Sequence, residues 1–374
     1  MKKQECGYFP DECWELIFQK LGEDHERDLD SISLVSKQFL SISNRVKHSL
    51  TLDMNAETLH LLLNILTNIL RRFRHIKSIV ISTNIHKSIH DPIAVDGVLD
   101  QIARSGVLLN LQTLRFRCHI EVLRDGFRAL ALSMVMKNNL KVLDCSGVIS
   151  MQDKDLILIA DLFPQLEELR IHAARRSHDD KVVVRITDDG VDALALKLKE
   201  LKEIVFSCDS NACFITDKSL ISLSTNCVKL RKIHLDIRST NEHNVSEDRM
   251  GFVMQHSTNM TSLSLDLLSL QPSASPFAIG NGFTNAKNLH SLTLGQALIS
   301  DKHISLLAKA YPPLKKLELD GGFIEDKYPE IHGALKLLLH ACQLTLEKID
   351  TGETNPRKLA PHRHGYQRVG SVSP

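Results

Sequence analysis

The chain has 374 residues and carries 46 Lys and Arg side chains against 45 Asp and Glu, which gives a net charge of +1. A balance this close to neutrality excludes long-range attraction to nucleic acid or to an anionic membrane, and it favours a specific protein partner. The first residues contain no apolar signal-peptide core, and the eight cysteines are scattered. We therefore expect reduced thiols and a protein of the nucleus, the cytoplasm or both.

Residues 1–48 are predicted to form a small bundle of three helices. The run FPDE at 9–12 is a helix start, because Pro is tolerated at the first helical position and acidic residues favour the first turn. Apolar residues then recur every three or four positions in two successive segments, which indicates helices that pack on one another. They are Cys13, Leu16, Ile17 and Leu21, followed by Leu29, Ile32, Val35 and Phe39.

These residues resemble an F-box, in the run FPDE, the following Leu/Ile helix and the run SLVSKQF at 33–39. Ser36 stands where the family usually has Cys, and Phe39 where it often has Trp. The run at 41–45 is similar to plant F-box/leucine-rich-repeat proteins. The resemblance implies docking on the Skp-type adaptor of a cullin-RING (SCF-type) ubiquitin ligase, and the alternative is an ordinary helical core. The residues implied in adaptor binding are Phe9, Pro10, Leu16, Ile17, Leu21, Leu29, Val35 and Phe39.

Two elements follow the bundle. Leu50 and Leu52 alternate with polar residues and predict a short first strand. The run from Leu59 to Leu70 is apolar but interrupted by polar residues, and it is too short to cross a bilayer. We expect it to be a buried helix of the next domain, without a membrane partner.

The segment CFITDKSLISLSTNCVKLRKIHLD, which begins at Cys213, combines a helix and a strand. Leu220, Leu223 and Cys227 have the spacing of one helical face. Ile233 and Leu235 alternate with polar residues, as in a strand buried on one side. Neither element can bury its apolar side alone, so stacked neighbours must supply the core.

The strand frame LxxLxL recurs along the chain with a mean step of 30 residues, slightly above the roughly 20–29 of typical leucine-rich repeats. Its middle apolar residues are Ile79, Leu114, Leu143, Leu169, Ile204, Ile233, Leu263, Leu292, Leu317 and Ile349. Ile215-Thr216-Asp217 and the run at 227–230 resemble the cysteine-containing leucine-rich repeat of F-box proteins. Thr216 is a predicted helix N-cap, and Asp217 suits the positive helix start.

The predicted fold is therefore α/β, with an N-terminal three-helix F-box followed by a curved leucine-rich-repeat solenoid that has a parallel concave sheet and convex helices. The predicted domains are the bundle at 1–48, a solenoid of about ten irregular repeats at 49–352 and a disordered tail at 353–374.

The sequence offers only fragments of a catalytic or metal site. Cys208 and Cys213 could join Cys118, His119 and His172 in a zinc site, but no CxxC pair anchors one. Phosphate-binding and nucleophile motifs such as GxxxxGK[ST] and GxSxG are missing from the sequence. We expect a chain without catalytic activity, metal or cofactor.

The concave strand face is the predicted binding surface for an unknown protein target, because repeat proteins usually bind there. Its acidic residues lie late in the chain and favour a Lys- or Arg-rich segment, whereas the early arginines could hold an anionic small molecule. A binding scaffold without ligase function and a hormone-like small-molecule receptor stay open as alternatives. The candidate target-binding residues are Arg115, Arg170, Lys232, His234, Asp236, Asp266, Glu318, Asp320 and Asp350.

Overall fold

The structure is a computed structural model that describes most of the chain. The described residues are 9–24, 26–54, 59–83, 95–105, 110–117, 120, 123–132, 134–148, 151–173, 186–208, 213–237, 246–256, 259–267, 282–284, 287–295, 300–310, 313–320 and 331–350. The predicted tail at 353–374 lies outside them. The chain divides into two compact units, residues 1–147 and 148–374, and each is described by itself.

The first unit contains the bundle and the first repeats. Its helices are α1 (Asp11–Asp24), α2 (Glu26–Ser33), α3 (Lys37–Val46), α4 (Leu59–Arg72), α5 (Asp96–Arg104), α6 (Arg124–Leu132) and α7 (Met134–Asn139). Its strands are β1 (Ser49–Met54), β2 (Ser78–Thr83), β3 (Thr113–Arg117) and β4 (Val142–Cys145). The predicted domain boundary at residue 48 stays a prediction, because the two units divide within the repeats.

The second unit continues the alternation of strand and helix. Its helices are α8 (Asp153–Leu162), α9 (Asp188–Lys197), α10 (Asp217–Asn226), α11 (Glu247–His256), α13 (Asp301–Ala310) and α15 (Ile331–Ala341). Its strands are β5 (Glu168–Ala173), β6 (Ile186–Thr187), β7 (Glu203–Cys208), β8 (Cys213–Phe214), β9 (Lys232–Ile237), β10 (Ser262–Leu267), β11 (Ser291–Gly295), β12 (Lys316–Asp320) and β13 (Lys348–Asp350).

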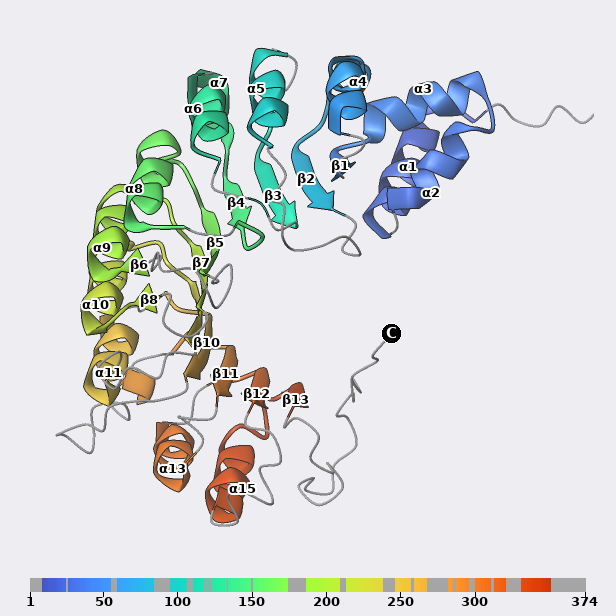
Figure 1. Cartoon of the computed structure of the whole chain (residues 1–374). Helices are drawn as coiled ribbons and strands as arrows, with labels where there is room; N and C mark the ends of the chain where they lie inside the picture. Colours follow the sequence, from blue (N-terminus) through green and yellow to red (C-terminus); the bar gives the residue numbers. More distant parts are fainter. Residues whose placement is uncertain are drawn as a thin grey trace, which may run out of the picture. The chain divides into compact units, whose positions relative to one another are not determined.

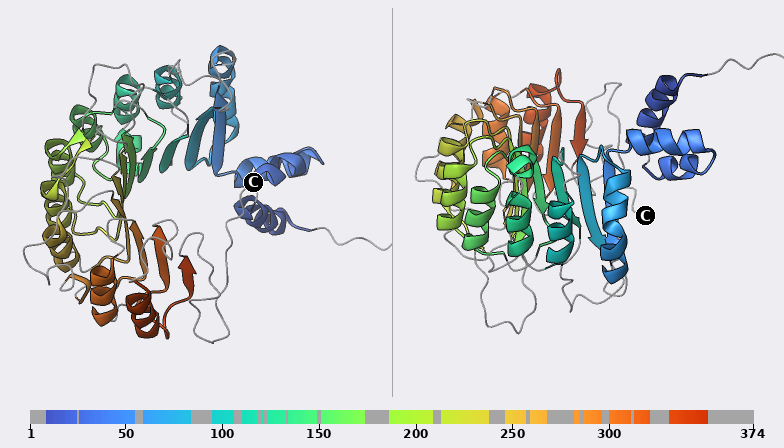
Figure 2. Two further views of the ribbon diagram at one scale, coloured as in Figure 1. Left: turned by 60° about the horizontal axis from the view of Figure 1, so that its bottom comes forward. Right: turned by 90° about the horizontal axis from the view of Figure 1, so that it is seen from above.

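The strands of each unit pair in parallel and in chain order, with the helices along one side of them (Figures 1 and 2). The short strands β6 and β8 form a separate pair at the starts of α9 and α10. The predicted strand frame is confirmed, because its middle apolar residues are register partners within each unit. They are Ile79, Leu114 and Leu143 in the first, and Leu169, Ile204, Ile233, Leu263, Leu292, Leu317 and Ile349 in the second.

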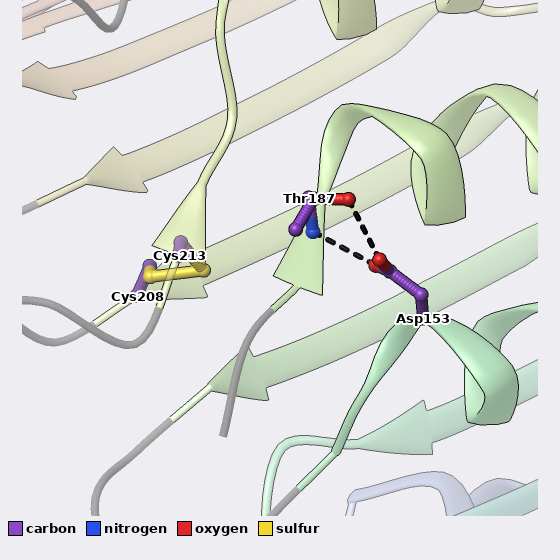
Figure 3. The surroundings of a disulfide bond; sticks show 4 residues. All are labelled: Asp153, Thr187, Cys208 and Cys213. Atoms are coloured by element: carbon purple, nitrogen blue, oxygen red, sulfur yellow. Dashed lines mark hydrogen bonds between the residues drawn. A yellow bond between two sulfur atoms is a disulfide. The ribbon is translucent and has the colours of Figure 1, made fainter. Parts of the chain in front are cut away.

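The aspartate at the start of one helix is hydrogen-bonded to the helix cap of the next repeat. Asp188 accepts hydrogen bonds from the backbone N of Thr216 at 2.8 Å and from its Oγ1 at 2.6 Å. It also accepts from the backbone N of Ser219 at 3.2 Å and from its Oγ at 2.6 Å. Asp153 binds Thr187 in the same way, as Figure 3 shows. The Ile-Thr-Asp motif thus joins neighbouring repeats as well as capping its own helix.

Cys208 and Cys213 form a disulfide, so the prediction that all thiols are reduced is wrong for this pair (Figure 3). The end of β7 and the start of β8 bring their Cα atoms to 6.1 Å, within the range that a disulfide spans. Both side chains are buried. This bond removes the two cysteines from the zinc site that the sequence had suggested.

The apolar helix predicted near residue 59 forms as α4, but only part of it is buried. Leu66 and Leu70 lie in the core, whereas Leu61 and Ile65 are about half exposed. Among the described helices, none combines the length and the apolar character that a bilayer span requires.

Candidate functional site

An apolar surface lies on the N-terminal bundle. Phe9, Leu16, Ile17, Leu34 and Val35 are all exposed, with Leu34 at 87%, Val35 at 69% and Leu16 at 68%. We call these five residues the helical patch. Leu16 and Ile17 come from α1, and Leu34 and Val35 from the turn between α2 and α3. Several large exposed apolar side chains on one small bundle are compatible with an interaction site.

Two other predicted adaptor-binding residues belong to or pack on the bundle core, whereas Pro10 is exposed and Leu21 is half-buried. Leu29 is buried with Phe18, Ile42 and Val46, and Phe39 packs against this cluster. Leu29 is only 4% exposed, whereas Phe39 is partly buried, and their predicted contact with an adaptor stays a prediction. Helical periodicity marks both kinds of residue alike, since each belongs to an apolar helix face.

Polar contacts fix the turn that carries Leu34 and Val35. Ser36 is the N-cap of α3, and its side chain accepts a hydrogen bond from the backbone N of Phe39 at 3.1 Å. Gln38 donates to Asp11 at 2.7 Å, which places the start of α3 beside the start of α1. This bond, with a second from Arg45, lowers the pKa of the Asp11 carboxyl. Ser36 therefore has a structural role of its own.

A second surface is a hollow of about 480 Å³ on the strand face of the second unit, the face turned away from the helices. Among the described residues that line it, Ile204, Val205 and Ile233 are apolar, and the others are polar or charged. We call it the strand-face hollow. The polar lining residues are Arg170, Glu203, Lys232, His234, Asp236, Ser262, Ser264, Asp266, Ser291, Thr293, Lys316 and Glu318.

The strand register sorts these side chains into three rows that cross the sheet. The first row is Glu203, Lys232, Ser262, Ser291 and Lys316. The second is Arg170, Val205, His234, Ser264, Thr293 and Glu318. The third begins with His172 and Ser207 and continues with Asp236 and Asp266.

The cationic side chains that line the hollow form ion pairs with neighbouring carboxylates. Arg170 bridges Glu168 and Glu203 with two contacts of 2.6 Å, and Lys232 lies 3.0 Å from Glu203. On the other side, Lys316 lies 2.9 Å from Glu318. The hydrogen bond from Lys316 is the main cause that lowers the pKa of Glu318, so this carboxylate is already paired.

The structure brings together six of the nine predicted target-binding residues, namely Arg170, Lys232, His234, Asp236, Asp266 and Glu318. Asp350 lies on β13 and does not line the hollow, and the side chain of Asp320 lies outside the described residues. Arg115 lies on β3 in the first unit. The expected attraction of a basic segment to Glu318 is weakened, because Lys316 already answers that charge.

Four small hydroxyl residues that line the hollow were not among the predicted target-binding residues. Ser262 and Ser264 lie on β10, and Ser291 and Thr293 lie on β11. The same alternation that identified the charged residues also places these four on the strand face. The predicted target-binding residues were all ionisable, so these four hydroxyl residues were not included.

Three of the remaining described cysteines, Cys145, Cys227 and Cys342, are buried and offer little reactivity. Burial raises the pKa of Cys227 and of Cys342 to about 11, so both are thiols at neutral pH. Burial raises the pKa of Cys145 still further. Among the described residues, no group of three His, Cys, Asp or Glu side chains is placed to hold a metal ion.

No family model matches the sequence, and no curated protein matches it. Among solved structures, the chain is similar to one from a TLR13–ssRNA13 complex, with 14% identity and a TM-score of 0.34. The similarity covers 83% of this chain and 44% of that chain, so the present chain spans less than half of the other's length. We draw no conclusion about function from a similarity at this level.

Proposed function

We propose that this chain is the substrate-recognition subunit of an SCF-type ubiquitin ligase. In this proposal the helical patch docks on a Skp-type adaptor, and the strand face holds a protein target for ubiquitination by other subunits. The chain itself is non-catalytic and works in the nucleus, the cytoplasm or both.

The observation that carries the proposal is the exposure of the residues that the F-box resemblance assigns to the adaptor. Five of the eight, Phe9, Pro10, Leu16, Ile17 and Val35, are exposed on the bundle. Exposed apolar side chains lose contact with water when a partner covers them, which stabilises the complex by about 1.5–3 kcal/mol for each side chain fully buried.

The hollow supports a protein target over a hormone-like small molecule. Small-molecule pockets are lined mainly by apolar and aromatic side chains. Here ion pairs and hydroxyl groups form most of the lining, and its described part contains no Phe, Tyr or Trp. A polar, elongated surface of this kind suits an extended segment of another protein.

The disulfide between Cys208 and Cys213 has to be compatible with the proposed cellular location. Disulfides are uncommon in proteins of the cytosol and nucleus. A ligase subunit that works there must fold with Cys208 and Cys213 reduced. The loop that they close is short, and its closure stabilises the fold by only about 2 kcal/mol.

A binding experiment with the purified adaptor tests the proposal. We expect Leu16→Asp with Val35→Asp to weaken adaptor binding at least about a hundredfold, or roughly 2.8 kcal/mol. Both residues are exposed, so the helices should keep their circular dichroism spectrum. Leu132→Asp is the matched control, because Leu132 is 84% exposed on α6 of the same unit and outside the patch. Equal binding by the patch variant and the control would exclude the helical patch as the adaptor site.

A further inference from the structure

Two arginines lie side by side on the strand face of the first unit. Arg115 and Arg117 alternate along β3 with the buried side chains of Leu114 and Phe116, so both face away from the core. β2 and β4 pair with β3 on either side (Figure 1). In the part of the chain that the structure describes, neither guanidinium forms an ion pair or a side-chain hydrogen bond. Their N–H donors are therefore available to a ligand.

The cations on the strand face of the second unit differ in this respect. Arg170, Lys232 and Lys316 each lie within 3.0 Å of a carboxylate of the same chain. An anion that approached them would have to compete with these carboxylates. On β3 an anion meets two guanidinium groups without such a competitor, so the capacity of the described strand faces to hold an anion is greatest there.

Two carboxylates share the rows of these arginines across the sheet, and both accept hydrogen bonds from serines. Asp144, the register partner of Arg115, accepts from the backbone N and the Oγ of the serine two residues later, at 3.0 and 2.5 Å. Asp53, in the row of Arg117, accepts from the hydroxyl of Ser82. These carboxylates offset the arginines at long range, so an anion is held by direct hydrogen bonds more than by a long-range field.

The spacing of the arginines matches that of two side chains on an extended peptide. Residues i and i+2 of a strand lie on one face, roughly 6.7 Å apart. Two acidic residues separated by one other residue have the same spacing when their chain is extended. Each guanidinium can then hold one carboxylate through two parallel N–H···O bonds. On β2 the side chains opposite the arginines are the short ones of Val80 and Ser82, which leave room for a bound segment.

We propose that the strand face at β3 binds an extended acidic segment of the target protein, in which two Asp or Glu residues separated by one residue pair with Arg115 and Arg117. The inference rests on the proposed role of the strand face in target binding. Arginine suits this task, because its guanidinium stays charged and its planar shape matches a carboxylate. The attraction weakens when salt screens it, as the Debye length falls from roughly 10 Å at about 0.1 M to roughly 3 Å at about 1 M.

Short synthetic peptides test this inference on the full-length chain. The probes are fluorescent peptides of about seven residues, roughly 24 Å when extended, built from Ala and Ser around a central Glu-Ala-Glu, Gln-Ala-Gln or Lys-Ala-Lys. We expect the Glu-Ala-Glu peptide to bind at least about fivefold more tightly than the Gln-Ala-Gln peptide, about 1 kcal/mol, because two partly exposed ion pairs are added. The Lys-Ala-Lys peptide should bind most weakly. Arg115→Gln with Arg117→Gln should abolish the preference while the melting temperature is retained.

The matched control is Arg71→Gln with Arg74→Gln, which removes the same two charges at exposed positions in and just after the last turn of α4. It should keep the preference for the acidic peptide. Equal binding of the three peptides, an unchanged preference in the Arg115/Arg117 variant, or no binding of the acidic peptide at about 1 mM would each overturn the inference.

Two further ligands test the extended segment itself. A peptide with two adjacent Glu residues has the same charge, but neighbouring side chains of an extended chain point to opposite sides, so only one carboxylate can reach β3. It should bind at least about twofold more weakly than the Glu-Ala-Glu peptide, about 0.4 kcal/mol. Succinate, a small dicarboxylate without a peptide backbone, should bind at least about tenfold more weakly. Either ligand binding as tightly as the Glu-Ala-Glu peptide would reject an extended segment.

Adaptor binding, measured on the same preparations, separates this inference from the proposed function. Acidic peptides that bind through Arg115 and Arg117 support the inference even if the adaptor does not bind, and in that case only the ligase role fails. An adaptor that binds while the peptides show no charge preference leaves the ligase role standing and rejects the acidic segment.

Discussion

Substitution of Asp188 should weaken the coupling between two repeats. Asp188→Ala removes the acceptor of four hydrogen bonds, two from Thr216 and two from Ser219. A hydrogen bond to a charged group is worth roughly 1.5–3 kcal/mol, and bonds to one carboxylate do not add fully. The Ser219 hydroxyl is 0% exposed and would lose this acceptor. We therefore expect the free energy of unfolding to fall by about 3–5 kcal/mol.

Chemical denaturation followed by circular dichroism measures this loss. Asp189→Ala is the matched control, because Asp189 occupies the same first turn of α9 and is exposed. It shares the favourable interaction with the helix dipole but has no described part in the bonds to Thr216 and Ser219, so its loss should stay below about 1 kcal/mol. Because repeat stability depends on neighbour interfaces, the Asp188 variant should also broaden the transition. Equal losses in the two variants would refute the role assigned to Asp188.

Three further predictions concern the repeats, the disulfide and the bundle. In urea denaturation, Ile233→Asp should lower the free energy of unfolding by at least about 4 kcal/mol, because it buries an unpaired charge. Lys232→Ala should lower it by less than about 1 kcal/mol. Similar losses in the two variants would mean that Lys232, and not Ile233, faces the core. Cys208→Ser with Cys213→Ser should lower stability by about 2 kcal/mol and leave adaptor binding unchanged, and a variant unable to fold would argue against function in a reducing compartment. Hydrogen bonds from α3 lower the pKa of Asp11 below 3.8, so its stabilising effect is present above pH 3.8 and is lost as the pH falls through the lowered value. The difference in Tm between the wild type and Asp11→Asn should accordingly shrink in acid, and a difference that is constant with pH would count against this contact.

Local patterns in the sequence predicted the strand register well. A strand buried on one side repeats every two residues, so each LxxLxL frame fixes which side chains face the core. Ile233 and Leu235 are buried, and Lys232 and His234 lie on the opposite face, as predicted. Thr216 is the helix N-cap that its residue type indicated.

Contacts between repeats could not be predicted from these local patterns. Asp217 suited the start of its own helix, but the structure shows that it also accepts hydrogen bonds from Ser246 of the next repeat. The pairing of Cys208 with Cys213 likewise depends on where β7 ends and β8 begins. Such contacts follow from the stacking geometry, which a single repeat does not contain.

The candidate sites were predicted only in part, because they also depend on contacts that local sequence patterns do not contain. Helical periodicity identified the apolar faces of the bundle but could not separate buried Leu29 from exposed Leu16. Alternation placed Glu318 and Lys316 on the same strand face, and the structure adds that the two are 2.9 Å apart in an ion pair.

Titration of the full-length chain with a purified Skp-type adaptor, followed by calorimetry, tests the proposed function most directly. The ligase role predicts a dissociation constant of about 1 μM or tighter, a binding free energy of roughly −8.2 kcal/mol, and its loss in the Leu16→Asp, Val35→Asp variant. A folded wild-type chain that gives no binding signal with the adaptor at about 100 μM, a concentration at which such a complex would be almost fully formed, would contradict the ligase role.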